Sequence, residues 1–125
     1  MVNVQDPCFL ATLQKIERDI LYPGGGVYRY QADTYFGGGE WLLLTCWLAW
    51  TYLKLARYEE AERLIQWTEE QATQDGEMPE QVSEHLLDPS YYQPWVERWG
   101  LPAKPLLWSH AMYLIVRTEL EATKK

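Results

Sequence analysis

The sequence predicts an all-α protein built of helical hairpins that form all or part of a toroid. Four segments show the apolar spacing of α-helices, whereas the alternating pattern of strands is nearly absent. Amphipathic segments also alternate along the chain with segments that are apolar on almost every side. This alternation is expected when inner helices line the centre of a ring and outer helices coat them.

The first expected helix runs from Pro7 to Leu21 and is an outer helix. Asp6 can cap its N-terminus, and Pro7 suits the first helical position because no N–H is needed there. Its apolar stripe consists of Phe9, Leu10, Leu13, Ile16, Ile20 and Leu21. The remaining surface is polar, which predicts that this helix faces water on one side.

The second expected helix, from Gly39 to Ala56, is an inner helix. Leucine and tryptophan residues lie on almost every side of it. We expect such a helix to be buried, because none of its faces suits water. A tight connection at Arg57 and Tyr58 then leads directly into the third helix.

The third and fourth expected helices repeat the outer and inner pair. The third ends before Asp75-Gly76, with glutamates on one face and apolar residues on the other: Ala61, Leu64, Ile65, Thr68 and Ala72. The fourth runs from Pro105 to Ala122 and carries charges only in its last turns. We therefore predict that the third helix lies on the surface and that the fourth is mostly buried.

Two long connections, Tyr22–Gly38 and Asp75–Lys104, each lead into an inner helix. Both should therefore lie on the same rim of the helical array. Loops of this length are usually functional or disordered. These two contain aromatic residues, glycines and carboxylates rather than a disordered composition, so the sequence predicts a binding site on that rim.

Composition narrows the possible partners. The formal charge of −7 argues against nucleic acid and anionic membranes, because both are bound through Lys and Arg. The longest apolar run, Trp41–Leu55, is shorter than a bilayer span. No signal-peptide pattern opens the chain, so we expect a cytoplasmic protein. His85 and His110 lack metal-ligand spacing, and we expect neither a metal nor another cofactor.

Each rim loop contains a recognisable stretch. The first is VYRYQADTYFGGGEW, residues 27–41, and the second is GEMPEQV, residues 76–82, followed by PLLWSHA, residues 105–111. Together they resemble glycoside hydrolase family 15, the glucoamylase-like and trehalase-like enzymes. The resemblance extends from Gly24 to Ile115. It implies an (α/α) six-hairpin toroid, of which residues 1–125 would be one partial domain from the C-terminal portion.

The resemblance also implies roles for single residues. Arg29 would donate forked hydrogen bonds to sugar hydroxyls, and Asp33 would orient Arg29 or accept from a hydroxyl. Trp41 would form an apolar wall, joined by Tyr35. In the second loop, Glu80 corresponds to the general base that activates water, and Trp108 would contact substrate at the start of the inner helix beneath it. The implied ligand is an oligosaccharide or glucoside.

One catalytic group has no counterpart in this sequence. An inverting glycosidase needs a second carboxyl group as general acid, and in the family this group lies on an earlier hairpin. Among local candidates, Asp33, Glu77 and Glu84 lie in the loops, and Glu40 lies at a helix start, which favours the ionised form and not an acid. We therefore expect a truncated hydrolase piece that is inactive alone and forms a homo-oligomer or binds a complementing chain.

Three alternatives stay open at this level. Arg29 and Asp33 could be an ordinary surface ion pair. The aromatic cluster of Tyr91, Tyr92, Trp95 and Trp99 could shape a sugar subsite or pack the loop onto the ring. The whole chain could instead be a non-catalytic helical-hairpin module that binds carbohydrate or protein, since residues 55–67 are weakly similar to tetratricopeptide-type hairpins.

Overall fold

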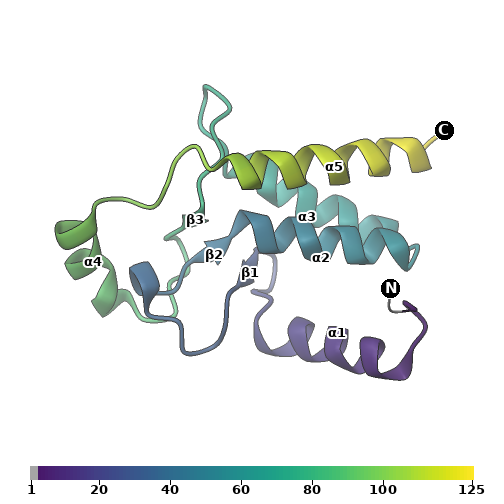
Figure 1. The fold of residues 1–125 in the computed structure, drawn as a ribbon, viewed down its shortest axis with the longest axis horizontal. Coiled ribbons are helices and arrows are strands. Elements are labelled where there is room, and N and C mark those ends of the chain that lie inside the picture. Colours follow the sequence, from purple (N-terminus) through teal and green to yellow (C-terminus); the bar gives the residue numbers. More distant parts are fainter. Residues whose placement is uncertain (1–2) are drawn as a thin grey trace.

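Five helices carry the fold in the computed structural model, which describes residues 3–125 (Figure 1). They are α1 (Pro7–Asp19), α2 (Leu42–Lys54), α3 (Tyr58–Glu70), α4 (Tyr92–Trp99) and α5 (Leu107–Thr123). The all-α prediction is confirmed. All four expected helices form, each within a few residues of its expected bounds, and α4 is an additional helix inside the second long loop.

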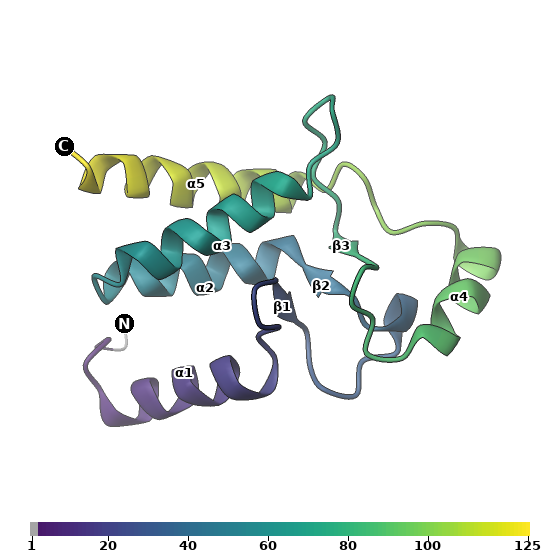
Figure 2. The ribbon, with the colours of Figure 1, turned by 180° about the vertical axis from the view of Figure 1, so that it is seen from behind.

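The long helices lie side by side and alternate in direction (Figures 1 and 2). Helices α2 and α5 begin at the same end of the molecule, next to a small sheet, whereas α1 and α3 run the opposite way. Helix α2 contacts both α3 and α5. Asp6 caps α1 as predicted, because its carboxylate accepts hydrogen bonds from the N–H groups of Cys8 and Phe9.

A short antiparallel sheet joins the two rim loops. It consists of β1 (Val27–Tyr28), β2 (Glu40–Trp41) and β3 (Gln81–Val82), in that order. The 3-10 turns η1 (Tyr35–Gly37) and η2 (Pro89–Tyr91) flank it along the chain. Because β2 pairs with a strand from each loop, the structure confirms that both loops lie on one rim.

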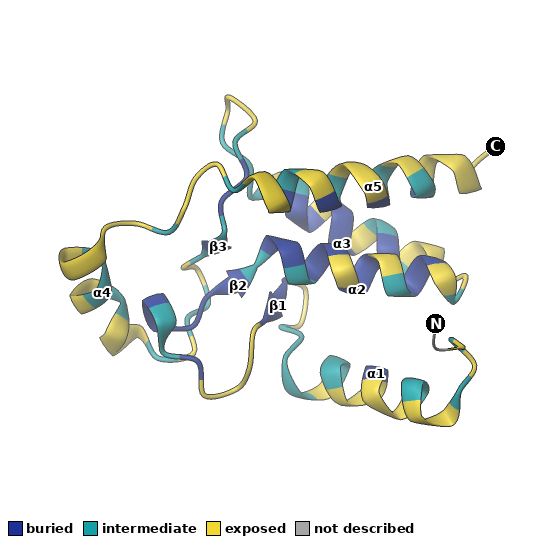
Figure 3. Cartoon of the chain, in the orientation of Figure 1, coloured by how far each residue is buried: buried dark blue, intermediate teal, exposed yellow. Residues whose placement is uncertain are grey.

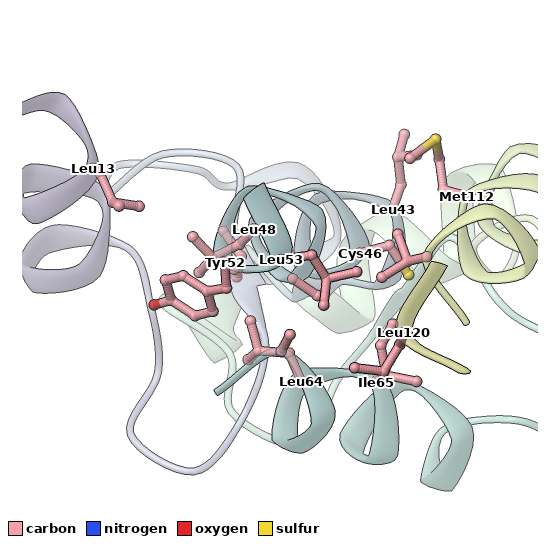
Figure 4. Packing of buried hydrophobic residues seen from close by; sticks show 14 residues of the cluster. Leu13, Leu43, Cys46, Leu48, Tyr52, Leu53, Leu64, Ile65, Met112 and Leu120 are labelled. Atoms are coloured by element: carbon pink, nitrogen blue, oxygen red, sulfur yellow. The ribbon is translucent and has the colours of Figure 1, made fainter. Parts of the chain in front are cut away.

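The apolar core lies between α2 and its neighbours (Figure 4). Helix α1 contributes Leu13, and α3 contributes its predicted face, of which Ala61 and Ile65 are fully buried. The central helix α2 supplies the largest share: Leu43, Cys46, Leu48, Ala49, Tyr52 and Leu53. Burial of apolar area of this kind supplies most of the stability of a domain of this size.

One side of the inner helices is not covered by the described chain, so the expectation of a mostly buried fourth helix is wrong. Only Ser109, Met112, Val116 and Leu120 of α5 are buried (Figure 3). An open apolar face remains, consisting of Trp47 and Trp50 of α2 and of Leu107, Trp108, Leu114 and Ile115 of α5. The apolar residues of α5 led to the prediction of burial, but no segment within residues 3–125 packs against this side of the helix. None of the helices described is long and apolar enough to cross a bilayer.

Candidate functional site

The candidate site lies where both inner helices begin. Strand β2 runs directly into α2, and the N–H of Leu42 donates to the carbonyl of Glu80 at 3.4 Å. The first turn of α5 holds the same loop, because Ser109 Oγ donates to the Pro79 carbonyl at 3.2 Å and His110 Nε2 accepts from the Met78 N–H at 3.0 Å. Glu80 is therefore fixed at the N-terminal ends of α2 and α5.

Arg29 and Asp33 form a forked pair in the first rim loop. Arg29 Nε lies 2.9 Å from Asp33 Oδ2, and Arg29 Nη2 lies 2.7 Å from Asp33 Oδ1. The side chain of Asp33 is fully buried, whereas that of Arg29 is 38% exposed. Asp33 also accepts a hydrogen bond from the Tyr35 N–H. A buried carboxylate thus orients an accessible guanidinium, whose remaining N–H groups can donate to a ligand.

Aromatic rings surround this guanidinium. Arg29 Cζ lies 4.9 Å from the ring centre of Tyr35 and 5.3 Å from that of Trp41. The Tyr35 and Trp41 rings are themselves stacked at 6.3 Å with an interplanar angle of 30°. Flat apolar walls beside oriented N–H donors match the two sides of a sugar, its C–H face and its hydroxyls.

Glu80 is half-buried beside this cluster. Burial raises the pKa of Glu80, and the positive charge of Arg29 offsets part of this rise. The pKa of Tyr35 is also raised, first by burial and then by the negative charge of Glu80. Glu80 directly precedes Gln81, which pairs with Trp41 across β2 and β3, so the backbone places Glu80 next to Trp41 and its stacked partner Tyr35. A carboxylate that is more basic than usual and partly shielded from water is suited to accept a proton.

Five of the six predicted site residues therefore gather in one place: Arg29, Asp33, Tyr35, Trp41 and Glu80. Trp108 differs, because its ring packs edge-on against Trp47 at 5.6 Å on the open apolar face, and its side chain is 56% exposed. A sugar contact by Trp108 stays a prediction.

Close backbone packing shapes the first rim loop. A Cβ atom on Gly38, which has φ +74°, would lie 2.3 Å from the Asp33 carbonyl oxygen. Phe36 also adopts the left-handed region, with φ +50°, although it is not glycine, and its ring is buried. Such conformations are costly and persist only where surrounding packing enforces them.

Glu40 forms a buried latch that the sequence did not reveal. Its carboxylate is fully buried in β2, accepts from the Gly26 N–H and contacts His85 Nδ1 at 2.7 Å. The His85 ring in turn stacks on Tyr22 at 4.0 Å. A carboxylate bound in this way holds the two rim loops together and presents no free group to a substrate.

Two buried donors beside the site lack a partner within residues 3–125. They are Trp41 Nε1 and Gln81 Nε2, which belong to residues paired across β2 and β3. Gln81 Oε1 is occupied, since it accepts from the Gly39 N–H at 3.0 Å. Buried polar groups are nearly always hydrogen-bonded, so each of these donors calls for an oxygen atom from water or a ligand.

Comparison with known proteins gives several strong similarities, although no protein-family model matches the chain. It is 49% identical over 96 residues to isomaltose glucohydrolase of Kribbella flavida, covering 77% of this chain and 25% of that protein. It is 30% identical over 128 residues to an uncharacterized glycosyl hydrolase of Methanocaldococcus jannaschii, covering 92% of this chain and 19% of that protein. A trehalase of Sulfolobus acidocaldarius is 44% identical over 66 residues, or 51% of this chain and 12% of that protein.

Solved structures give the same result for the fold. A glycosidase variant in complex with glucose superposes with a TM-score of 0.92 at 42% identity, over 96% of this chain and 32% of its own. The wild-type glycosidase gives the same values. The chain thus spans a quarter or less of the curated relatives and about a third of the solved glycosidases.

Proposed function

The chain is related to glycoside hydrolases, and on that premise we propose that it supplies the general base and the sugar-binding loops of an inverting, glucoamylase-like or trehalase-like active site. Glu80 is the base in this proposal, and Arg29, Tyr35 and Trp41 hold the sugar. The observation that carries it is the placement of Glu80, a half-buried carboxylate, next to Trp41, whose ring lines the Arg29–Asp33 pair.

The reaction assigned to Glu80 is proton abstraction from water. Its carboxylate accepts a proton as the water oxygen attacks the anomeric carbon, and the glycosidic oxygen leaves with a proton from a second carboxyl group. In inverting enzymes the two groups are about 6.5–9.5 Å apart, which leaves room for the water. The unpartnered donors Trp41 Nε1 and Gln81 Nε2 would hydrogen-bond the sugar or that water.

We infer that the general acid comes from residues outside this stretch of chain. Asp33 is bound to Arg29 through both oxygens, and Glu40 is bound to His85 and the Gly26 N–H. Neither carboxyl can present a proton to a leaving group. We infer that the open apolar face receives the complementing polypeptide, because α5 otherwise exposes large leucine and tryptophan side chains to water.

The same face supports a second candidate, a non-catalytic module that binds sugar or protein through its helical hairpins. Leu107 is 81% exposed and Leu114 is 61% exposed, which favours contact with another polypeptide. Glu80 separates the two candidates, because a general base matters for hydrolysis and not for docking.

Calorimetric titration of the purified chain with glucose, maltose, trehalose and acarbose tests the proposed site. Binding should weaken in Arg29→Lys, because a lysine cannot reproduce the forked donor geometry. Arg18→Lys is the matched control, since Arg18 is exposed on α1 and pairs with its neighbour Asp19. Absence of binding in a folded wild-type chain would contradict the sugar site.

Glu80→Gln tests the catalytic role. Sugar affinity should change little, whereas glucose release should vanish in the assembly of this chain with its complementing polypeptide. Glu59→Gln is the matched control, because Glu59 is exposed on α3, away from the rim loops. Full activity of Glu80→Gln would exclude Glu80 as the base.

A further inference from the structure

A row of aromatic rings leads from the candidate site to the surface of α4. Tyr35, stacked on Trp41, lies 5.3 Å from the ring of Trp95, and Trp95 lies 6.1 Å from the ring of Trp99. We call Trp41, Tyr35, Trp95 and Trp99 the aromatic row. Its inner end is half-buried beside Glu80, and its outer end is open to solvent, with Trp99 62% exposed.

Helix α4 is anchored to the first rim loop and not to the long helices (Figures 1 and 2). Trp95 packs on Phe36 at 5.7 Å as well as on Tyr35. Backbone hydrogen bonds join the same loops, from the Leu87 N–H to the Gly38 carbonyl and from the Asp88 N–H to the Gly37 carbonyl. The position of α4 relative to Tyr35 and Trp41 is therefore fixed by aromatic packing on η1 and by these backbone hydrogen bonds.

The outer end of the row contains an open hollow. It measures about 340 Å³ and is lined by Tyr91, Pro94, Trp95, Arg98 and Trp99. The guanidinium of Arg98 lies 5.1 Å from the ring centre of Trp99. No leucine, isoleucine or valine lines this hollow, in contrast to the open apolar face on α2 and α5.

We propose that this hollow on α4 binds the leaving-group sugar, the second ring of a di- or oligosaccharide whose first ring lies against Trp41 and Arg29. The inference rests on the proposed function and adds the part of the substrate that α4 selects. Trp95 meets Tyr35 edge to face at an interplanar angle of 65°, whereas Trp95 and Trp99 are tilted by only 35° and both line the hollow. These two rings can together receive the C–H face of one pyranose, and Arg98 supplies donors for its hydroxyls. The released ring belongs at the exposed end, from which a product can leave.

Trp99→Ala tests the proposal, because this exposed side chain can be removed without a core cavity. Calorimetry should give a maltose or isomaltose affinity about three- to tenfold weaker than wild type, the scale of one lost aromatic contact. Glucose affinity should stay unchanged, since glucose occupies only the inner end. Leu101→Ala is the matched control: it follows α4, is 67% exposed and does not line the hollow. Circular dichroism confirms that each variant is folded.

The outcomes separate this proposal from the function on which it rests. If the wild-type chain binds neither glucose nor any disaccharide, both the α4 subsite and the proposed sugar-binding function are contradicted. If the wild-type chain binds glucose and Trp99→Ala leaves the disaccharide affinity unchanged, the α4 subsite alone is contradicted. The same holds if Trp99→Ala weakens the binding of glucose and disaccharide equally. Arg98→Ala provides a second test with the same selective loss expected.

Discussion

At the scale of single residues, Glu80 combines a partly buried position with a negative charge. Burial raises its pKa above the ordinary value, so its ionised form is less favourable in the folded chain than in the unfolded chain. A raised carboxyl pKa favours folding at low pH, and this contribution is lost as the pH rises through the folded-state pKa. The ionised form of Glu80 at neutral pH therefore costs stability.

Glu80→Gln should accordingly be more stable than wild type at pH 7. Its advantage should shrink as the pH falls, because the wild-type carboxyl group then becomes neutral as well. Urea unfolding of wild type, Glu80→Gln and Glu84→Gln at pH 7 and at about pH 4, near the ordinary carboxyl pKa, measures the effect. A loss of stability at pH 7 in Glu80→Gln would identify Glu80 as a structural ion-pair member.

The Arg29–Asp33 pair differs from an ordinary surface ion pair in its burial. Arg29→Ala would leave the carboxylate of Asp33 charged and enclosed, with only the Tyr35 N–H as a donor. Because Arg29 is partly exposed, we expect a loss of about 1–3 kcal/mol in the free energy of unfolding. Arg18→Ala, which removes an exposed partner of Asp19, should cost less than about 1 kcal/mol. If urea unfolding shows that Arg29→Ala and Arg18→Ala both cost less than about 1 kcal/mol, the Arg29–Asp33 pair behaves as an ordinary surface ion pair.

At the scale of elements, the contact between β2 and β3 decides where Glu80 lies. A Cβ atom on Gly39 would lie 2.3 Å from the Val82 carbonyl oxygen and 2.7 Å from Gln81 Oε1. Gly39→Ala should therefore push β3 away, cost about 3 kcal/mol of stability and weaken sugar binding.

Gly24→Ala is the control for this change. Gly24 has φ +76° with nothing near its Cβ position, so only the backbone cost of about 1–2 kcal/mol should appear. Its sugar affinity should equal that of wild type. Similar sugar affinities in both variants, measured by calorimetry, would show that strand packing does not position the site.

The sequence predicted the four long helices but neither the short strands nor α4. The four long helices were predictable because apolar periodicity, capping and glycine or proline breaks act locally. The strands were not, because two-residue strands are too short to show alternation. Helix α4 was also missed, since it is short and carries Pro94 near its start, where a missing N–H is tolerated.

The candidate site likewise contains residues that the sequence predicted and contacts that it did not. Two motifs predicted the cluster from Arg29 to Glu80, whereas the Glu40–His85 latch joins residues 45 positions apart. Neither residue has a local pattern that marks its partner, so only the folded loops reveal the pair. Contacts between Trp95 and Tyr35 were unpredictable for the same reason.

At the scale of the whole molecule, α2 is buried in the apolar core on one side and belongs to the open apolar face on the other. Core residues of α2 pack against α1 and α3, while Trp47 and Trp108 meet edge-on at the surface. A helix surface with this many exposed leucine, isoleucine and tryptophan side chains is a site for association, because burying apolar area lowers the free energy. We therefore expect the 14.7 kDa chain to associate with itself when no complementing polypeptide is present.

Leu114→Lys combined with Ile115→Lys should abolish this association. Both side chains are exposed on α5, so the free energy of unfolding should change by no more than about 0.5 kcal/mol per site. Light scattering over a concentration series measures the mass. Ala11→Lys combined with Gln14→Lys is the matched control, because it adds the same charge to the exposed side of α1. The open apolar face is the interface only if the α5 variant becomes monomeric while the α1 variant still associates. A wild-type chain that is monomeric at every concentration would show that this face does not drive self-association.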